Sequence, residues 1–453
     1  MKRALPAALL LLTFAGAACG GSASEPQPTP VSGATASPTA LTLPPDRSHD
    51  PAPLAKPDPA LRFDHRTLEL PSNVGLKDPS SLAFGPDGRL YVSQVNGRIL
   101  ALTLDGFTVT NVETIATTAE LQDVLGIAFN PSDSPAPLTL YITQTSVFAG
   151  GDAPPYPSKV SKLVAPDFTP VDIITGLPVS PREHATNGLA FDGQGRLYIA
   201  QGSATNAGVT GAQGRSESPL SGAVLVADID DPAFDGAIQY DPPGPPSVTT
   251  EQVSGDVRVF ASGFRNPYDL VVHSNGRIYA TDNGPNRSPI QALDCETDGP
   301  PDPTAPDELN LVLDGHYYGH ANRNRGRSDP RQCTYAIPLD ASAGATPPIA
   351  LLGYSTSADG LVEYTADAFG GRMRGDLIYV EWAQGRVWRV QLSSDGTSVV
   401  AISRFSPDVL QRPLDVTVGP DGTVYVVENG AGRISYFIPV QPEPDVRSAS
   451  DTP

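Results

Sequence analysis

The chain contains the run Ser81-Leu82-Ala83-Phe84-Gly85-Pro86-Asp87-Gly88-Arg89-Leu90-Tyr91-Val92, in which a Pro-Asp-Gly turn joins two apolar segments. A tight turn between two such segments is typical of a β-hairpin. Five further copies of the pattern lie at residues 126–143, 187–200, 268–281, 375–390 and 413–427. The closest turns are about 45 residues apart, which is the spacing of four-stranded propeller blades. The sequence therefore predicts an all-β fold, a six-bladed β-propeller, with seven blades as the alternative.

The N-terminal residues predict an exported protein. Met1-Lys2-Arg3 is positively charged, an apolar stretch runs from Ala4 to Phe14, and small residues precede Cys19. This is the pattern of a secretory signal, and it is too short to span a membrane. Residues 1–19 resemble a bacterial lipoprotein signal, in which Cys19 becomes lipidated, although Gly16 stands where that signal usually has leucine. An ordinary signal peptide is the alternative. The expected location is extracytoplasmic, either as a cell-envelope lipoprotein or as a secreted protein.

Composition divides the rest of the chain into three parts. Residues 20–60 consist mainly of Ser, Ala, Thr, Pro and Asp, so we predict a disordered tether there, and residues 443–453 are predicted to be a disordered tail. Residues 61–442 form the predicted propeller. The formal net charge of −20 disfavours binding to nucleic acid or to an anionic membrane surface. The lipid on Cys19 is therefore the only membrane contact that we expect.

Two cysteines remain after Cys19. Cys295 and Cys333 both lie in loop sequence that is rich in Pro, Gly and Asp. An even pair of loop cysteines in an exported protein predicts a disulfide. A zinc site would need more ligands than the neighbouring sequence offers.

The most unusual stretch is Gly263-Phe264-Arg265-Asn266-Pro267-Tyr268-Asp269-Leu270, which leads through an Asn-Gly hairpin to an Asp-Asn-Gly-Pro-Asn exit at residues 282–286. Polar groups at strand ends are where all-β proteins place ligands. Asp307-Glu308-Leu309-Asn310-Leu311 and Gly315-His316-Tyr317-Tyr318-Gly319 follow. In this order the motifs resemble the glucose/sorbosone dehydrogenase family, soluble sugar dehydrogenases that use pyrroloquinoline quinone (PQQ). The resemblance spans roughly Leu82 to Phe437.

The resemblance implies an enzyme with PQQ and calcium as cofactors, a sugar-like substrate and an external electron acceptor. It makes His184 the catalytic base, since imidazole suits proton transfer near neutral pH. The residues that would hold PQQ are Arg265, Asn266 and Arg412, with Gln122 as a match displaced by one position. Calcium favours oxygen ligands, and its implied ligands are the main-chain carbonyls of Gly284 and Pro285, with a second site at Asp307, Glu308 and the Tyr318 carbonyl.

Three positions depart from the family pattern. Ala383 stands where the family has a cofactor-binding lysine, Leu414 replaces a second cofactor arginine, and Asn187 replaces a glycine. Loss of two positive charges should weaken the binding of an anionic quinone, unless one of three other arginines compensates: Arg182, Arg323 or Arg325.

The leading hypothesis is thus an exported PQQ- and calcium-dependent oxidoreductase that oxidises a sugar, aldose or related polyol. The alternative is a non-catalytic, calcium-containing propeller that binds carbohydrate or protein, which Ala383 and Leu414 favour. A lactonase-type hydrolase is a weaker alternative that rests on fold analogy. Trp382 and Trp388, at strand positions, are predicted to belong to the propeller core.

Overall fold

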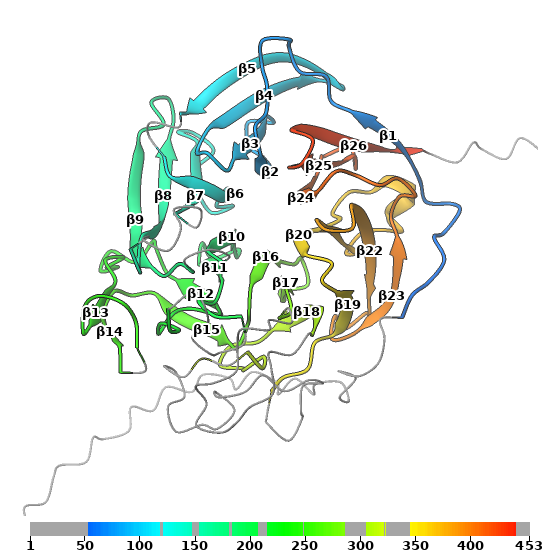
Figure 1. Cartoon of the computed structure of the whole chain (residues 1–453). Helices are drawn as coiled ribbons and strands as arrows, with labels where there is room; N and C mark the ends of the chain where they lie inside the picture. Colours follow the sequence, from blue (N-terminus) through cyan, green and yellow to red (C-terminus); the bar gives the residue numbers. More distant parts are fainter. Residues whose placement is uncertain are drawn as a thin grey trace, which may run out of the picture. The chain divides into compact units, whose positions relative to one another are not determined.

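A computed structural model describes residues 53–117, 121–146, 154–180, 184–206, 215–247, 249–285, 305–320, 322 and 345–440. All of them belong to one compact unit, Pro44–Pro453. Within it, six four-stranded sheets surround a central axis, so the predicted six-bladed β-propeller is confirmed (Figure 1). Among the described residues, the one helix is the short 3-10 helix η4 (Ala368–Gly371), and no helix is long and apolar enough to cross a membrane.

Each blade is an antiparallel sheet whose strands follow one another outward from the axis. The first three blades are β2 (Pro79–Phe84), β3 (Leu90–Gln94), β4 (Ile99–Asp105) and β5 (Thr108–Ala116); β6 (Asp123–Ala128), β7 (Thr139–Thr145), β8 (Ser158–Val164) and β9 (Pro170–Leu177); and β10 (Thr186–Phe191), β11 (Leu197–Gln201), β12 (Ala223–Ala227) and β15 (Arg258–Ser262). A separate hairpin of β13 (Gln239–Asp241) and β14 (Glu251–Ser254) is inserted before β15.

The last three blades follow the same order. They are β16 (Pro267–Val272), β17 (Ile278–Asp282), β18 (Pro306–Val312) and β19 (Ala350–Tyr354); β20 (Ala358–Glu363), β21 (Leu377–Glu381), β22 (Arg386–Leu392) and β23 (Val399–Arg404); and β24 (Pro413–Val418), β25 (Val424–Glu428), β26 (Arg433–Val440) and β1 (Arg62–Thr67). The ring is closed by the N-terminal strand β1, which pairs antiparallel with β26 from Arg62 opposite Val440 to Thr67 opposite Ser435.

The predicted turns have the expected chemistry. Gly88, Gly276 and Gly422 adopt positive φ values of 78°, 79° and 84°, which glycine tolerates without a steric cost. In each turn the preceding Asp or Asn side chain accepts a hydrogen bond from the backbone N–H two residues further on. The recurrent Asx-Gly pairs of the sequence therefore fix the hairpins between the first and second strands of these blades.

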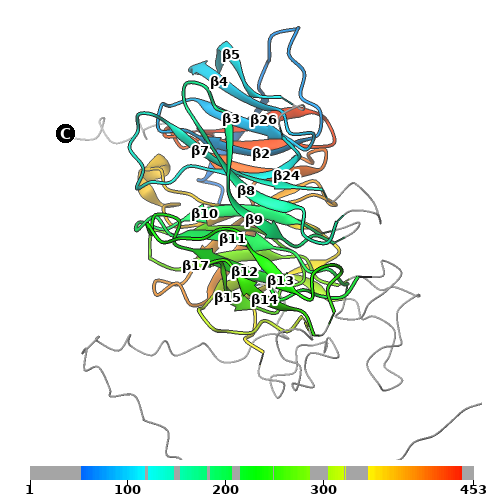
Figure 2. The ribbon, with the colours of Figure 1, turned by 90° about the vertical axis from the view of Figure 1, so that its left-hand side faces the viewer.

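The hydrophobic core is divided among the six contacts between neighbouring blades. For example, Tyr91 and Ile99 of the first blade pack with Ile127 and Leu140 of the second. Five further clusters are built in the same way, because each draws its buried apolar residues from two adjacent blades. Figure 2 shows neighbouring sheets packed face to face in this way. The apolar residues of the repeats thus hold the blades against each other and leave the axis to other side chains.

The inner strands β2, β6, β10, β16, β20 and β24 each depart from regular register near their first residues. Two buried carboxylates tie these irregular segments to the next blade. Asp269 of β16 accepts the backbone N–H of Leu361 on β20 at 2.8 Å. Asp415 of β24 accepts the Ser81 hydroxyl at 2.6 Å and the Leu82 N–H at 3.0 Å, both on β2. These bonds hold the inner strand starts together around the axis.

One predicted boundary is wrong, because ordered structure begins before residue 61. The backbone of residues 53–55 bonds to Ile402 on β23, through Ala55 N–H to Ile402 O and Ile402 N–H to Pro53 O. An edge strand offers unpaired backbone groups to any neighbouring segment, so composition alone placed the boundary too late. Several predicted residues lie outside the described part of the chain: Cys19, Arg182, Cys295, Arg323, Arg325 and Cys333. The same holds for the rest of the tether and for the tail.

Candidate active site

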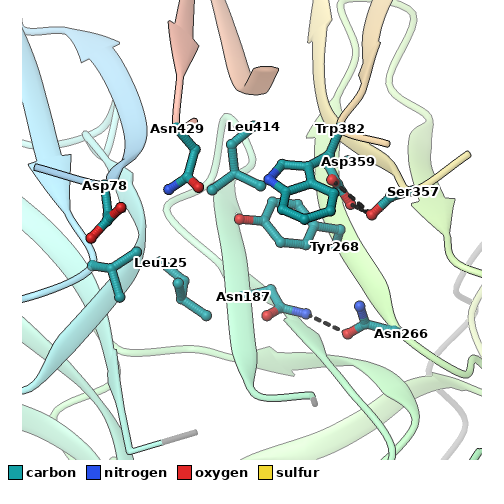
Figure 3. Close-up of a pocket in the computed structure, with 11 residues that line it drawn as sticks. Asp78, Leu125, Asn187, Asn266, Tyr268, Ser357, Asp359, Trp382, Leu414 and Asn429 are labelled. Atoms are coloured by element: carbon teal, nitrogen blue, oxygen red, sulfur yellow. Dashed lines mark hydrogen bonds between the residues drawn. The ribbon is translucent and has the colours of Figure 1, made fainter. Parts of the chain in front are cut away.

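A cavity of about 470 Å³ lies where the inner strands begin, and all six blades contribute to its wall (Figure 3). Seven of its residues directly precede or follow the first residue of an inner strand, and three others directly follow the second strand of their blade. The lining residues are Asp78, Val95, Leu125, Asn187, Asn266, Tyr268, Ser357, Asp359, Trp382, Leu414 and Asn429. The cavity is therefore built from equivalent positions of the repeats.

Trp382 supplies the aromatic part of the wall. It directly follows β21, and its backbone N–H donates to Ser357 O at 2.9 Å, which holds it at the start of β20. The guanidinium carbon of Arg412 lies 4.5 Å from the centre of the indole ring, a cation–π contact. The prediction that Trp382 is core is incomplete, because the ring packs against the apolar cluster between the sixth and first blades and also lines the cavity. Trp388 packs with the core as predicted.

Two amides lie together on the opposite side of the cavity (Figure 3). Asn187 Nδ2 donates to Asn266 Oδ1 and to Pro267 O, each at 2.9 Å. The backbone N–H of Asn266 donates to Asp282 Oδ1 at 2.7 Å, which fixes the Arg-Asn-Pro corner. Because its Oδ1 is used by Asn187, Asn266 presents its Nδ2 as the donor for a ligand.

The Tyr268 hydroxyl is the group of the cavity wall that most clearly indicates a bound ligand. Its oxygen is buried and has no hydrogen-bond partner among the residues that the structure describes. Burial, with nearby Asp359 and Asp415, raises the pKa of this hydroxyl well above its usual value, so it stays protonated. A buried hydroxyl without a partner destabilises the folded protein. An acceptor on a bound ligand would satisfy it.

His184 lies just before β10 and does not line the cavity itself, whereas Asn187, three residues further on, does. Only 4% of its surface is exposed. Nδ1 donates to Ser203 O at 3.0 Å, which leaves Nε2 as the basic nitrogen. Burial and then the positive charge of Arg265 lower the His184 pKa well below its ordinary value. The ring is therefore neutral and able to accept a proton.

Close backbone approach explains the small residue opposite this ring. A Cβ atom at Gly202 would lie 2.6 Å from His184 Cβ and 2.8 Å from Asn266 Oδ1. Real Cβ atoms do not approach other atoms so closely. Gly202 thus allows His184 and Asn266 to lie against the same segment.

Arg265 is buried beside His184 and holds two loops. Its Nε and Nη2 donate to Asn206 Oδ1 at 3.1 and 2.9 Å, and Nη1 donates to Asn283 O at 3.2 Å. Only 4% of its surface is exposed. The predicted pair Arg265 and Asn266 is thus brought to the site, with Asn266 on the cavity wall and Arg265 behind it.

The residues predicted to bind calcium have other contacts. Asp307 accepts the Gly284 N–H through Oδ1, and its Oδ2 accepts three donors from Thr356 and Ala358. Pro285 O accepts the N–H of Ala305 at 3.1 Å. Asp307 therefore acts as a brace between β18 and the start of β20.

Glu308 and Tyr318 complete the predicted second calcium site. Glu308 accepts Asn310 Nδ2 at 3.2 Å, and burial followed by the charge of Asp282 raises its pKa to about 8. Tyr318 binds main-chain atoms of residues 311 and 313 through its hydroxyl. In the described ranges, no three His, Cys, Asp or Glu side chains come together as metal ligands. The second calcium site therefore stays a prediction from the resemblance.

The departures from the family pattern fall in different places. Leu414 lines the cavity, so an aliphatic side chain takes the place of the expected arginine in the wall itself. Ala383 and Gln122 are exposed and do not line the cavity. Gln122 binds its neighbour Gln144 through its backbone N–H at 3.0 Å.

Several wall residues were missed from the sequence: Asp78, Tyr268, Asp359, Trp382 and Asn429. A signal was present in the repeat. Asp78 directly precedes β2 as Asn266 precedes β16, and Trp382 and Asn429 directly follow the second strands β21 and β25. Superimposing the copies strand by strand would have placed these residues on one rim.

A profile of the Glucose / Sorbosone dehydrogenase family matches residues 76–436. The chain belongs to the glucose/sorbosone dehydrogenase family. Among curated relatives, quinoprotein glucose dehydrogenase B of Acinetobacter calcoaceticus is 25% identical over 274 residues, which is 54% of this chain and 51% of that protein. The match therefore spans about half the length of the relative.

Several solved structures share the fold. The PQQ-bound aldose sugar dehydrogenase of Streptomyces coelicolor is 19% identical, with a TM-score of 0.56, over 84% of this chain and 99% of the other. The soluble aldose sugar dehydrogenase of Escherichia coli is also 19% identical, with a TM-score of 0.56, over 83% and 100%. A Trichoderma reesei enzyme of carbohydrate-active family AA12, in its calcium structure, is 18% identical, with a TM-score of 0.55, over 86% and 98%.

Proposed function

We propose that this family member is a PQQ-dependent oxidoreductase that oxidises a hydroxyl group of a sugar, aldose or related polyol. The observation that carries the proposal is a buried, neutral His184 beside Arg265, held next to a cavity that all six blades line. The family assignment and the PQQ of its structural relative support the choice of cofactor. Export, calcium binding and the identity of the sugar stay predictions.

The cavity wall fits a flat aromatic quinone. Its volume of about 470 Å³ lies in the range of small-molecule sites. The Trp382 ring offers a plane for stacking, and Asn266 Nδ2 and the unpartnered Tyr268 hydroxyl offer donors to ligand oxygens. When bound, PQQ would be the oxidant that accepts two electrons from the substrate.

The charge of the site fits less closely. Among its described lining residues the cavity has two aspartates and no Lys or Arg, and Leu414 occupies a place expected to be cationic. The carboxylates of PQQ would therefore depend on Arg412, which covers the Trp382 ring, and on the field of the buried Arg265. We infer that the cofactor is bound more weakly than by a site that also has the family's lysine at position 383 and arginine at position 414.

The chain's own chemistry in the reaction is proton transfer. His184 Nδ1–H is fixed by Ser203 O, and in this proposal Nε2 is the atom that takes the proton of a sugar hydroxyl bound beside the cavity. Its lowered pKa keeps the ring unprotonated at neutral and mildly acidic pH. Activity should therefore not be lost through protonation of this base as the pH falls from 7 to 6.

Calcium is proposed at the main-chain carbonyls of Gly284 and Pro285 only. Carbonyl oxygens suit this ion, and each carbonyl has two lone pairs, so the bond from Ala305 leaves Pro285 O with one for a ligand. A cation here would add positive charge beside the Arg265–Asn283 contact.

Reconstitution tests the proposed function. The purified protein is mixed with calcium and PQQ, and reduction of an electron-accepting dye is followed with a panel of aldoses and polyols. We expect turnover with at least one sugar and none when PQQ is omitted. Saturable PQQ binding without turnover on any sugar would instead favour the non-catalytic propeller.

A further inference from the structure

One short segment contacts both candidate active-site residues. Residues 202–206 follow β11, and Ser203 O accepts His184 Nδ1 while Asn206 Oδ1 accepts two donors of Arg265. The backbone N–H of Ser203 also donates to Arg265 O at 2.8 Å. The conformation of this segment therefore sets the tautomer of His184 and the orientation of Arg265.

A single buried carboxylate, Glu217, holds the same segment. Its Oε2 accepts Ala204 N–H at 2.8 Å, and its Oε1 accepts Thr205 N–H at 2.9 Å and the Thr205 hydroxyl. The Ser221 hydroxyl donates to Oε2, and His320 Nε2 lies 3.3 Å from Oε1. Only 3% of Glu217 is exposed. One side chain thus gathers five donors.

These donors keep Glu217 ionised. Burial alone would raise its pKa, but hydrogen bonds and charge from His320, with the Ser221 and Thr205 hydroxyls, bring the net pKa below its ordinary value. Bonds to an ionised acceptor are about twice as strong as neutral ones. The segment 202–206 is therefore held by charge-assisted bonds rather than by ordinary loop contacts.

We infer that Glu217 is a positioning residue that aligns His184 and Arg265 through the segment 202–206. Glu217 does not line the cavity and acts through the backbone of Ala204 and Thr205. The inference deepens the proposed function and rests on it for the part that concerns turnover. The alignment of His184 can be tested without any cofactor.

The test compares Glu217→Gln with a matched control, Glu363→Gln. Glu363 is also buried, accepts a serine N–H and hydroxyl (Ser274, at 2.7 and 2.5 Å) and lies 3.5 Å from a histidine, His273. Its partners lie in the turn that follows β16, at the other end of the strand from Asn266. The two substitutions remove the same kind of carboxylate, but only Glu217 contacts the segment 202–206.

The readout is the ¹⁵N spectrum of the His184 ring in the cofactor-free protein, assigned with His184→Asn, together with turnover after reconstitution. The amide introduced by Glu217→Gln would direct its N–H groups at donors, so we expect the Nδ1–H tautomer to lose its dominance and turnover to fall roughly 10–100-fold. Glu363→Gln should leave the His184 spectrum unchanged. Ser221→Ala removes one of the five donors to Glu217, together with the contacts of this hydroxyl to Ser218 and Asn322. It should shift the spectrum in the same direction by less, and it replaces Glu217→Gln if that variant fails to fold.

An unchanged His184 spectrum in both Glu217→Gln and Ser221→Ala would overturn the inference, and so would an equal change in Glu363→Gln. If the spectrum shifts as expected but the wild-type protein takes up no PQQ, the positioning role stands and the proposed function fails. The spectroscopic and the catalytic arms thus separate the two claims.

Discussion

Replacing His184 with alanine is expected to lower turnover by about 10²–10⁴-fold, the usual contribution of a positioned general base. The ring is buried and neutral, and its Nδ1 is held by Ser203 O, so only Nε2 can accept the substrate proton. PQQ affinity should change little, since His184 does not line the cavity. Dye-reduction kinetics measure the turnover, and titration with PQQ measures the cofactor affinity.

His65→Ala is the control for this prediction. His65 lies on β1, stacks on Phe437 and contacts Asp408, away from the described cavity. Its loss should leave turnover within about twofold, as is common for substitutions away from a site. Turnover of His184→Ala above half the wild-type rate would show that another group is the base.

Stability in the absence of metal is expected to fall as the pH rises from 5 to 8. Burial raises the pKa of Asp415 to about 6, above the value of about 3.9 for an unfolded chain. Between these values the folded protein binds more protons than the unfolded chain, so raising the pH through 6 removes stability. A pKa difference of this size corresponds to about 3 kcal/mol in the free energy of unfolding over the whole titration, of which about 1.4 kcal/mol is lost above pH 5.

Asp415→Asn should flatten this dependence, because an amide does not titrate. Urea unfolding at pH 5 and pH 8 measures it, and the difference in the free energy of unfolding between these two pH values should shrink by about 1.4 kcal/mol relative to the wild type. Substitution of the exposed Asp105 by Asn is the control and should leave the slope as it is. A wild-type protein that is more stable at pH 8 than at pH 5 would contradict the prediction. Burial of Asp269 raises its pKa too, so some dependence should persist in the variant.

The fold could be predicted because the sequence signals that specify it, short turns between apolar strands, are local and occur in six copies. Each Asx-Gly turn lies between two apolar segments, and six copies leave few architectures other than a propeller. Closure of the ring could not be derived, since β1 meets β26 across almost the whole propeller sequence and its residues show no turn or repeat signal. Pairing between distant segments is set by the packed ring, not by local preference.

The site was predictable only where a motif marked it. Asn266 and Leu414 occupy positions that the resemblance marked for the cofactor, and both line the cavity, while Arg412 contacts Trp382 on its wall. The place of Trp382 on the cavity wall was missed, although its packing against the core was predicted, because the sequence does not show which strand ends face the axis. Glu217 carried no motif at all, and its five donors come together only in the folded blade.

The central claim is that the cavity at the inner strand starts binds PQQ. The chain has two tryptophans, and Trp382 lines the cavity, so Trp388→Phe leaves a single reporter on its wall. PQQ is titrated into this variant in the presence of calcium, and quenching of the Trp382 fluorescence is recorded, with and without the additional change Leu414→Arg. We predict saturable quenching, with the dissociation constant lowered about tenfold or more by the added arginine. Folded, calcium-loaded protein whose Trp382 fluorescence shows no saturable response to PQQ would contradict the account.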